Sequence, residues 1–328
     1  MRDVDTLSLT WRALTLDDAP ALARLWAAAE AADDTGENYD ADDVAEELGA
    51  PLLDLARDTI GVFGPDGEFV AWGGLRGGPA QISDVHRVWA DGTVLPAARG
   101  RGIGRELLGR QLARARELHL ERHPQAPGQF CVAGYDKVES RTALFRAAGF
   151  EPVRWWYDMH RDLTAPLPEL PPMPAGLRLE PYAPERDEAV RLAHGEAFAG
   201  HWGSTPPDRE RWGHWYTGAQ AFRPEHSLLV LAGDEVVGYL LTYYYTADHE
   251  ATGVREAWVG QIGVRPAWRR RGLGVQLLGS ALSVFRDAGY GRVGLNVDTD
   301  NSTGALGLYQ RLGFEVARPS ITWATALG

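Results

Sequence analysis

The chain carries two copies of one short pattern, in which arginines lead into a Gly-x-Gly pair that opens a helical stretch. The copies read ARGRGIGRELLGRQL and WRRRGLGVQLLGSAL, with Gly102 and Gly272 at matching places, 170 residues apart. The segments AAGF and RLGF match in the same way, with Phe150 and Phe314 164 residues apart. Similar offsets for several anchors indicate that one domain type is present twice. This duplication predicts a fold of two like domains, which the length of 328 residues also favours.

A proline-rich stretch separates the two copies. The segment TAPLPELPPMPAG, residues 164–176, holds five prolines. Proline fixes φ and removes a backbone donor, so such a stretch is typical of a semi-rigid linker. We therefore expect an N-terminal half over residues 1–163, a linker over 164–176 and a C-terminal half over 177–328.

Each half repeats one order of elements. An extended segment precedes an amphipathic helix, a β-hairpin, a longer strand that ends before the glycine motif, a helix, a strand, a second helix and a last Gly-Phe strand. This order predicts an α/β fold with a mixed (α+β) sheet in each half, while no parallel βαβ context is apparent around the motif. The expected strands are Leu7–Ala13, two arms within 59–75, Asp84–Leu95 and Gln129–Ala133 in the first half, and Leu177–Pro181, two arms within 227–245, Arg255–Arg265 and Arg292–Val297 in the second.

Composition narrows the function classes. The net charge of −12 argues against a broad nucleic-acid surface. No apolar run is long enough to span a bilayer and the first residues lack a signal-peptide pattern, so we expect a cytoplasmic protein without a membrane partner, as a monomer or homodimer. Cys131 is the single cysteine, which excludes an intrachain disulfide and a cysteine-rich metal site, and we expect no metal.

The glycine motif is suited to an anion. The first N–H groups of a helix have no intrahelical acceptor, and glycine lets a ligand approach the main chain closely. A phosphate-binding P-loop needs Gly-Lys-Ser/Thr, which neither copy has, and a dinucleotide motif needs a third glycine where this chain has Leu107 and Leu277. The flanking arginines add donors that match phosphate oxygens. The motif is therefore suited to hold a pyrophosphate on its main-chain amides and arginines.

The motif and the segments around it resemble the GNAT (general-control-related N-acetyltransferase) superfamily. The pattern Arg-x-x-Gly-x-Gly follows a strand ending IGVRP, and LNVDTDNSTGALGLYQRLGF continues the match, so that the resemblance covers 177–327. It implies acetyl-CoA as cofactor, bound in a V-shaped opening between the fourth and fifth strands. By this resemblance the cofactor contacts are Ile262, Gly263, Val264, Arg269, Arg270, Arg271, Gly272, Leu273, Gly274 and Asn301, with Val94, Arg99, Gly100, Arg101, Gly102, Ile103 and Gly104 as their counterparts in the first half.

The resemblance also implies catalytic roles. Tyr309 matches the family tyrosine that protonates the departing thiolate, although its spacing fits a core aromatic residue equally well. Glu256 is our candidate for the base that takes a proton from the amine, and it also fits a surface charge at a strand end. Asn301 fits a plain helix N-cap as well as a cofactor contact.

The first half keeps the glycine motif but departs from the pattern elsewhere. Phe145 stands where the second half has Tyr309, and no asparagine precedes that helix. We therefore expect the first half to be degenerate in catalysis, with CoA binding left open. Asp84, His86 and Asp91 on its fourth strand leave a catalytic interpretation available.

The acceptor is expected to be a small-molecule amine. An aromatic insertion after the first helix of the C-terminal half offers flat faces for sugars or cations, and we select Trp202, Trp215 and Tyr244 as substrate contacts. The same aromatics, with Trp212, also suit an interface between domains. A degenerate first half before a complete second half resembles tandem enzymes that acetylate the cysteinyl amine of a pseudo-disaccharide thiol. An aminoglycoside or peptide amine, or a non-catalytic acyl-CoA sensor, are the alternatives.

Overall fold

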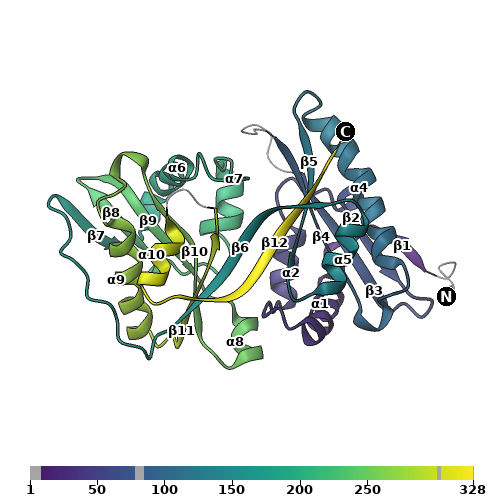
Figure 1. Cartoon of the computed structure of the whole chain (residues 1–328), viewed down its shortest axis with the longest axis horizontal. Coiled ribbons are helices and arrows are strands. Elements are labelled where there is room, and N and C mark those ends of the chain that lie inside the picture. Colours follow the sequence, from purple (N-terminus) through teal and green to yellow (C-terminus); the bar gives the residue numbers. More distant parts are fainter. Residues whose placement is uncertain (1–8, 78–84, 301–303, 328) are drawn as a thin grey trace. The chain divides into compact units, whose positions relative to one another are not determined.

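The computed structural model describes residues 9–77, 85–300 and 304–327 (Figure 1). The chain divides into two compact units. Unit 1 comprises Met1–Trp155 with Ser320–Gly328, and unit 2 comprises Trp156–Pro319. No described helix is long and apolar enough to cross a membrane.

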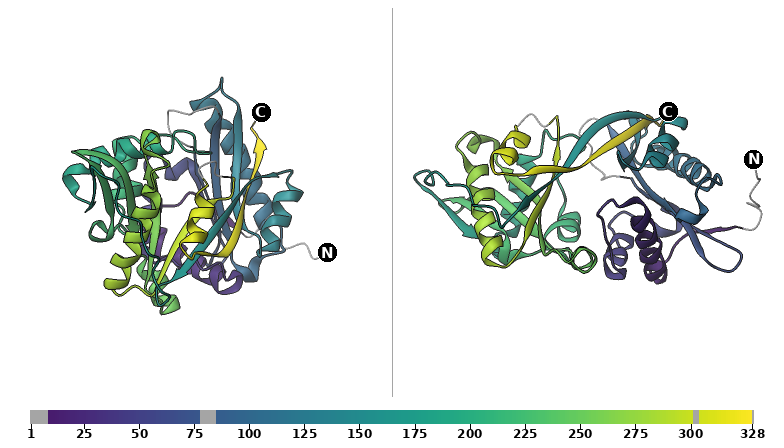
Figure 2. Two further views of the ribbon diagram at one scale, coloured as in Figure 1. Left: turned by 60° about the vertical axis from the view of Figure 1, so that its left-hand side comes forward. Right: turned by 60° about the horizontal axis from the view of Figure 1, so that its bottom comes forward.

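The described strands of unit 1 lie in the order β1-β2-β3-β4-β5-β12 in the sheet. The β4–β5 pair is parallel, and the pairs β1–β2, β2–β3, β3–β4 and β5–β12 are antiparallel. One face packs on α4 and α5, the other on α1 and α2 (Figure 2). The bounds are β1 Thr10–Arg12, α1 Ala19–Asp33, α2 Ala41–Leu48, α3 Leu55–Asp58, β2 Thr59–Phe63, β3 Phe69–Arg76, β4 His86–Val94, α4 Ile103–Arg122, β5 Gly128–Tyr135, α5 Glu139–Ala147 and β12 Glu315–Ala326.

Unit 2 repeats this plan with the order β6-β11-β10-β9-β8-β7, in which β10 and β11 are the parallel pair. Helices α9 and α10 cover one face, and α6 and α7 cover the other. The bounds are β6 Glu151–Asp162, β7 Leu177–Pro181, α6 Asp187–Ala197, α7 Arg209–Trp212, β8 Leu228–Ala232, β9 Glu235–Tyr243, α8 Thr246–Thr252, β10 Glu256–Val264, α9 Leu273–Asp287, β11 Arg292–Asp298 and α10 Ala305–Arg311.

The predicted mixed α/β fold is confirmed, with one correction. In both units the segment around the glycine motif is a βαβ crossover, β4-α4-β5 and β10-α9-β11, and its strands are parallel. The expectation that no such context surrounds the motif is therefore wrong. An antiparallel hairpin precedes each crossover, and its turn residues give a clear local signal in the sequence. Parallel pairing joins strands that lie on either side of a helix, so no local signal marks it.

Two strands pair with the sheet of the other sequence repeat and not with the sheet of their own. The last part of β6, residues 156–162 of the N-terminal half, pairs antiparallel with β11 in unit 2. The last part of β12, residues 320–326 at the end of the chain, pairs antiparallel with β5 in unit 1. Each compact unit thus completes its sheet with the final strand of the other repeat.

Candidate functional site

The sheet of unit 2 opens between its two parallel strands. β10 pairs with β11 from Glu256 with Arg292 to Val259 with Leu295, and the pairing ends there. Beyond that point β10 stays bound to β9 as far as Val264, with a register shift between Val259 and Gln261. One backbone edge of 260–264 is therefore turned away from β9 and is not used by β11, as a ligand that pairs with an exposed strand edge requires.

The turn after this strand presents main-chain amides. Gly272 is the N-cap residue of α9, directly before Leu273. Its φ of 81° is a conformation that suits glycine. The first intrahelical bond runs from the Gln276 amide to the Gly272 carbonyl at 3.0 Å, so the amides of 273–275 have no intrahelical acceptor. A Cβ added at Gly272 would meet no atom within 4 Å, so the space before the turn is open. Gly274 faces inward instead, where an added Cβ would lie 3.0 Å from Leu308.

The three arginines of the motif have different surroundings. The Arg269 guanidinium donates to the carbonyls of Val264 at 3.3 Å and Ala197 at 2.6 Å, so it ties the turn to the strand and to α6. Arg271 lies over the Trp268 ring at 4.7 Å. Arg270 is exposed, has φ 60° and has no hydrogen-bond or ion-pair partner among the described residues. Among these three predicted contacts, Arg270 is therefore the side chain most available to an anion.

Tyr309 lies on α10, packed in the core that also holds α9. Its side chain is 7% exposed, and within the described part of the chain its hydroxyl has no hydrogen-bond partner. Burial raises the pKa of Tyr309 to about 12, so the phenol keeps its proton at neutral pH. The phenol is thus protonated and not committed to another group. Asn301, predicted beside it, lies outside the described residues.

Glu256 lies at the first position of β10, four residues before the opening. Its carboxylate accepts a hydrogen bond from Arg292 and lies 3.7 Å from His160 Nε2. Burial raises the pKa of Glu256 and outweighs the lowering by Arg292. A raised pKa makes this carboxylate a better proton acceptor. When it accepts a proton, the carboxylate must also keep or release its hydrogen bond from Arg292.

Polar side chains that the sequence did not single out lie on the same face as Glu256. Alternate residues of β6 and β11 contribute to the core under α9, so those between them project to the other face. There Asn296 donates to Asp158 at 2.8 Å. Asp298 is 2% exposed, 3.9 Å from His201. Asp158 belongs to the segment WWYDMHRD, in which apolar and polar residues alternate as in a half-buried strand. This alternation does not predict that β6 pairs with β11 in unit 2.

The predicted acceptor aromatics lie in separate groups. Trp202 contacts Trp156, with ring centroids 6.2 Å apart. Tyr244 lies 5.8 Å from Tyr290, next to Arg255. Trp215 lies in the π-helical turn Gly213–Thr217, edge-on to its neighbour His214. Of the three, only Trp202 lies beside the polar face of β6 and β11.

Unit 1 repeats the opening and encloses a cavity there. β4 pairs with β5 only from His86 to Ala90, and Gly102 begins α4 with φ 87°. A cleft of about 470 Å³ follows, lined by the end of β4, the glycine turn and α5. Phe145 lines it where unit 2 has Tyr309. The predicted contacts Val94, Arg99, Gly100, Gly102, Ile103 and Gly104 all line this cleft, and Arg101 is exposed beside them.

Arg99 and Arg269 occupy equivalent places and act alike. Arg99 Nε donates to the Val94 carbonyl at 3.0 Å, and its two terminal nitrogens bind the Asp33 carboxylate at 2.6 and 2.8 Å. The first arginine of each motif therefore fastens the turn to the strand end. Cys131 is fully buried in β5, and burial raises the pKa of its thiol to about 12, so it is a residue of the core.

The residues of both openings fit a CoA molecule. An unpaired strand edge suits amide groups, and open amides at a positive-φ glycine suit a diphosphate. The described residues that would hold it in unit 2 are those of 262–264 and 269–274.

Comparison with known proteins agrees with this geometry. The model of the "Acetyltransferase (GNAT) family" matches residues 187–314. A mycothiol acetyltransferase of Tsukamurella paurometabola is 32% identical over 94% of this chain and 96% of its own length, and one of Rhodococcus erythropolis is 30% identical over 85% and 91%. A GCN5-related N-acetyltransferase from Sphaerobacter thermophilus matches with a TM-score of 0.75 and 28% identity over 97% of this chain and 96% of its own. A tandem GNAT protein of clavulanic acid biosynthesis shares the fold, with a TM-score of 0.66 and 20% identity over 98% and 99%. This chain belongs to the GNAT acetyltransferases and is similar to the mycothiol acetyltransferases over nearly its whole length.

Proposed function

We propose that the C-terminal half transfers an acetyl group from acetyl-CoA to the primary amine of a small molecule, by direct attack within a ternary complex. The observation that carries this proposal is the open split between β10 and β11, which is followed by open amides at Gly272. Tyr309, which keeps its proton, belongs to the core cluster that also holds the start of α9. Acetyl-CoA supplies the activated thioester when bound.

The residues of unit 2 supply the proton transfers. An amine must lose a proton to attack, because exposed amines are mostly ammonium at neutral pH. Glu256 accepts that proton, directly or through water, and its raised pKa favours this step. Tyr309 donates its phenolic proton to the departing sulfur. The open edge of 262–264 orients the reactants, and the hydrophobic core around α9 and α10 keeps water out.

The acceptor we favour is the cysteinyl amine of a pseudo-disaccharide thiol, the precursor of mycothiol. The similarity to mycothiol acetyltransferases over nearly the whole chain supports it. The polar face with Asp158, Asn296 and Asp298 offers partners for an ammonium group and sugar hydroxyls. An aminoglycoside or peptide amine is the second candidate, for two reasons. Asn296 stands where the resemblance to mycothiol enzymes leads us to expect a tyrosine, and Glu256 lies at the start of β10, away from the Gly263-Val264 end of that strand.

A thiol-release assay on the full chain tests the proposal. We expect Tyr309→Phe to lower kcat by about 100-fold or more, the usual size of a general-acid contribution, with CoA affinity little changed. Tyr290→Phe is the matched control, since Tyr290 is also buried in this core but bonds His226 at 3.1 Å. CoA binding without turnover on any amine, and no effect of Tyr309→Phe, would instead support an acyl-CoA sensor.

A further inference from the structure

His160 enters the sheet of unit 2 on β6, the strand that ends the first repeat. In the register of β6 with β11, His160 lies opposite Gly294, and in the register of β10 with β11, Gly294 lies opposite Trp258. Glu256 lies two residues further from the opening, opposite Arg292. His160 is therefore on the same face of the sheet as Glu256 and is closer to the point where β10 and β11 part.

A glycine lets the side chains of His160 and Glu256 approach each other across a strand. β11 lies between β6 and β10, so their backbones are two strand spacings apart, roughly 10 Å. A Cβ added at Gly294 would lie 2.8 Å from Glu256 Oε1 and 2.5 Å from the Trp258 ring. The Glu256 side chain thus extends over Gly294, and its Oε2 lies 3.7 Å from His160 Nε2. A larger residue at position 294 would occupy the space that brings the two groups together.

The imidazole and the carboxylate differ in how readily they take a proton. Burial lowers the pKa of His160 to about 4, and Arg292 and Arg318 lower it further, so the ring is neutral at neutral pH. Burial raises the pKa of Glu256. His160 Nε2 is buried and has no hydrogen-bond partner among the described residues, while the side chain as a whole is 20% exposed. The pair therefore favours a proton on the carboxylate over a positive charge on the imidazole.

From this geometry we propose that His160 passes a proton from the acceptor amine to Glu256, an inference that rests on the proposed acetyl transfer in unit 2. An ammonium N–H bond breaks and an Nδ1–H bond forms, while the Nε2–H bond breaks and an O–H bond forms on Glu256. The ring stays neutral because it gives one proton as it takes another. The lone pair left on the amine nitrogen attacks the thioester carbonyl, and exchange with water afterwards restores the carboxylate and the starting tautomer.

This proton relay requires the distance between Nε2 and Oε2 to shorten from 3.7 Å to hydrogen-bond length. Catalytic hydrogen bonds are often long without substrate and shorten when it binds. The relay also gives the first repeat a part in the chemistry of unit 2, since the strand it contributes supplies the imidazole.

Chemical rescue of the full chain tests the relay. His160→Ala removes the ring, and we expect kcat/KM in the thiol-release assay to fall by about 100-fold, the usual size of a proton-transfer contribution. CoA affinity measured by calorimetry should not change, which shows that the variant is folded. The amine probes are kanamycin A and S-methylcysteinamide, whose blocked thiol leaves CoA as the only thiol detected.

Two additives separate a relay from a simple base. Imidazole at about 50 mM should raise kcat/KM of His160→Ala by about tenfold or more, because it can take a proton at one nitrogen and give one from the other. 1-Methylimidazole is similar in shape and basicity but has no N–H, so it should not restore activity. Equal rescue by the two compounds would overturn the relay.

His226→Ala is the matched control, because its side chain is 14% exposed and bonds Tyr290, away from the polar face. It should keep kcat/KM within about twofold and show no response to imidazole. Wild-type kcat/KM in His160→Ala would overturn the relay and leave the proposed acetyl transfer standing. Release of thiol with neither amine by the wild type would contradict the acetyl transfer and the relay together.

Discussion

The two halves share one backbone arrangement around the glycine motif, the proposed cofactor cradle, but differ in the side chains that lie beside it. Each has a split parallel pair, a positive-φ glycine at the mouth of a helix and an arginine tied to the strand end. Beside the split, unit 2 has Tyr309 where unit 1 has Phe145, and Glu256 where unit 1 has the fully buried His86. The comparison teaches that the features made of backbone are present in both copies, whereas the side chains proposed for proton transfer occur together in one.

The largest loss of activity is expected when a substitution at the glycine motif blocks the proposed cofactor site in one half at a time. Gly272→Glu places a side chain and a negative charge at a positive-φ position facing open space. We expect turnover to fall below detection, by at least about 1,000-fold, because more than 4 kcal/mol of transition-state binding is lost. Calorimetry should show one CoA fewer per chain.

Gly102→Glu is the matched change in unit 1, where φ is 87°. It should also remove one CoA per chain, with a far smaller loss of turnover than Gly272→Glu. Equal losses of turnover from the two variants would contradict the assignment of catalysis to the C-terminal half. Unchanged CoA binding in Gly272→Glu would remove the cradle assignment altogether.

The second effect concerns the position that Glu256 shares with His86. A base acts only when deprotonated, so kcat/KM should decline as the pH falls through the raised pKa of Glu256. We expect Glu256→Gln to lower kcat/KM by about 100-fold near neutrality and to remove this acidic limb. His86 bonds His119 Nδ1 at 2.9 Å and the Gly77 carbonyl, which leaves its ring no role as a base. An unchanged pH profile in Glu256→Gln would move the base to another residue of the polar face.

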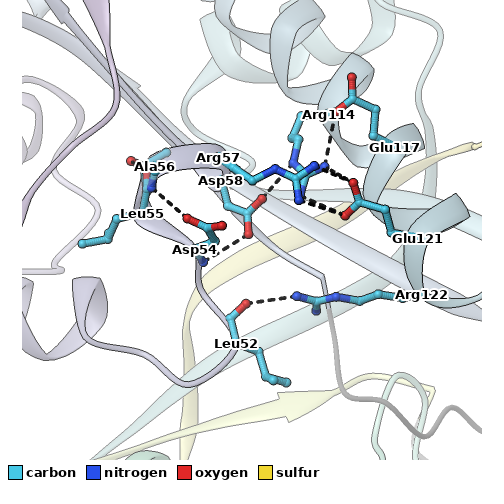
Figure 3. A network of polar contacts seen from close by, with 11 residues as sticks. Leu52, Asp54, Leu55, Ala56, Arg57, Asp58, Arg114, Glu117, Glu121 and Arg122 are labelled. Carbon is cyan, nitrogen blue, oxygen red and sulfur yellow. Dashed lines mark hydrogen bonds and ion pairs between the residues drawn. The ribbon is translucent and has the colours of Figure 1, made fainter.

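The third and smallest effect is on stability and belongs to unit 1. Figure 3 shows Arg114 of α4 between Asp58, at 2.9 Å, and Glu121, at 3.0 Å. The Asp58 side chain is only 2% exposed, so Arg114→Ala leaves a buried carboxylate without its main partner. We expect unfolding free energy from urea titration to fall by about 3 kcal/mol.

Arg110→Ala is the control for that change, because its pair with Glu106 lies on the surface of the same helix. Such pairs contribute about 0.3–0.5 kcal/mol. The equivalent of Arg114 in α9 is Val284, so a comparable network is not built at that place in unit 2. A loss no greater than that of the control would show that the network is not needed for stability.

The sequence predicts the repeated elements and the cradle well because their causes are local. Periodicity defines β7 as Leu177–Pro181, and the glycines define where α4 and α9 begin. The partners of the arginines are harder to predict from the sequence. Arg269 donates to the carbonyl of Ala197, which lies 72 residues earlier in the chain. The polar face was missed for a similar reason: Asp158 and Asn296 meet only through strand pairing across the sheet. The roles of Glu256, Tyr309 and the aromatic residues remain predictions until the assays above are done.

The exchanged strands bear on how such a duplicated protein can change. Residues 156–162 end the repeat that has Phe145 in place of Tyr309, yet they carry Asp158 and His160 into the sheet beside Glu256. Removing the first repeat as a block would therefore also remove the strand that pairs with β11, and the sheet of unit 2 would lose its edge. Substitutions in residues 156–162 act on unit 2, although these residues belong to the first repeat.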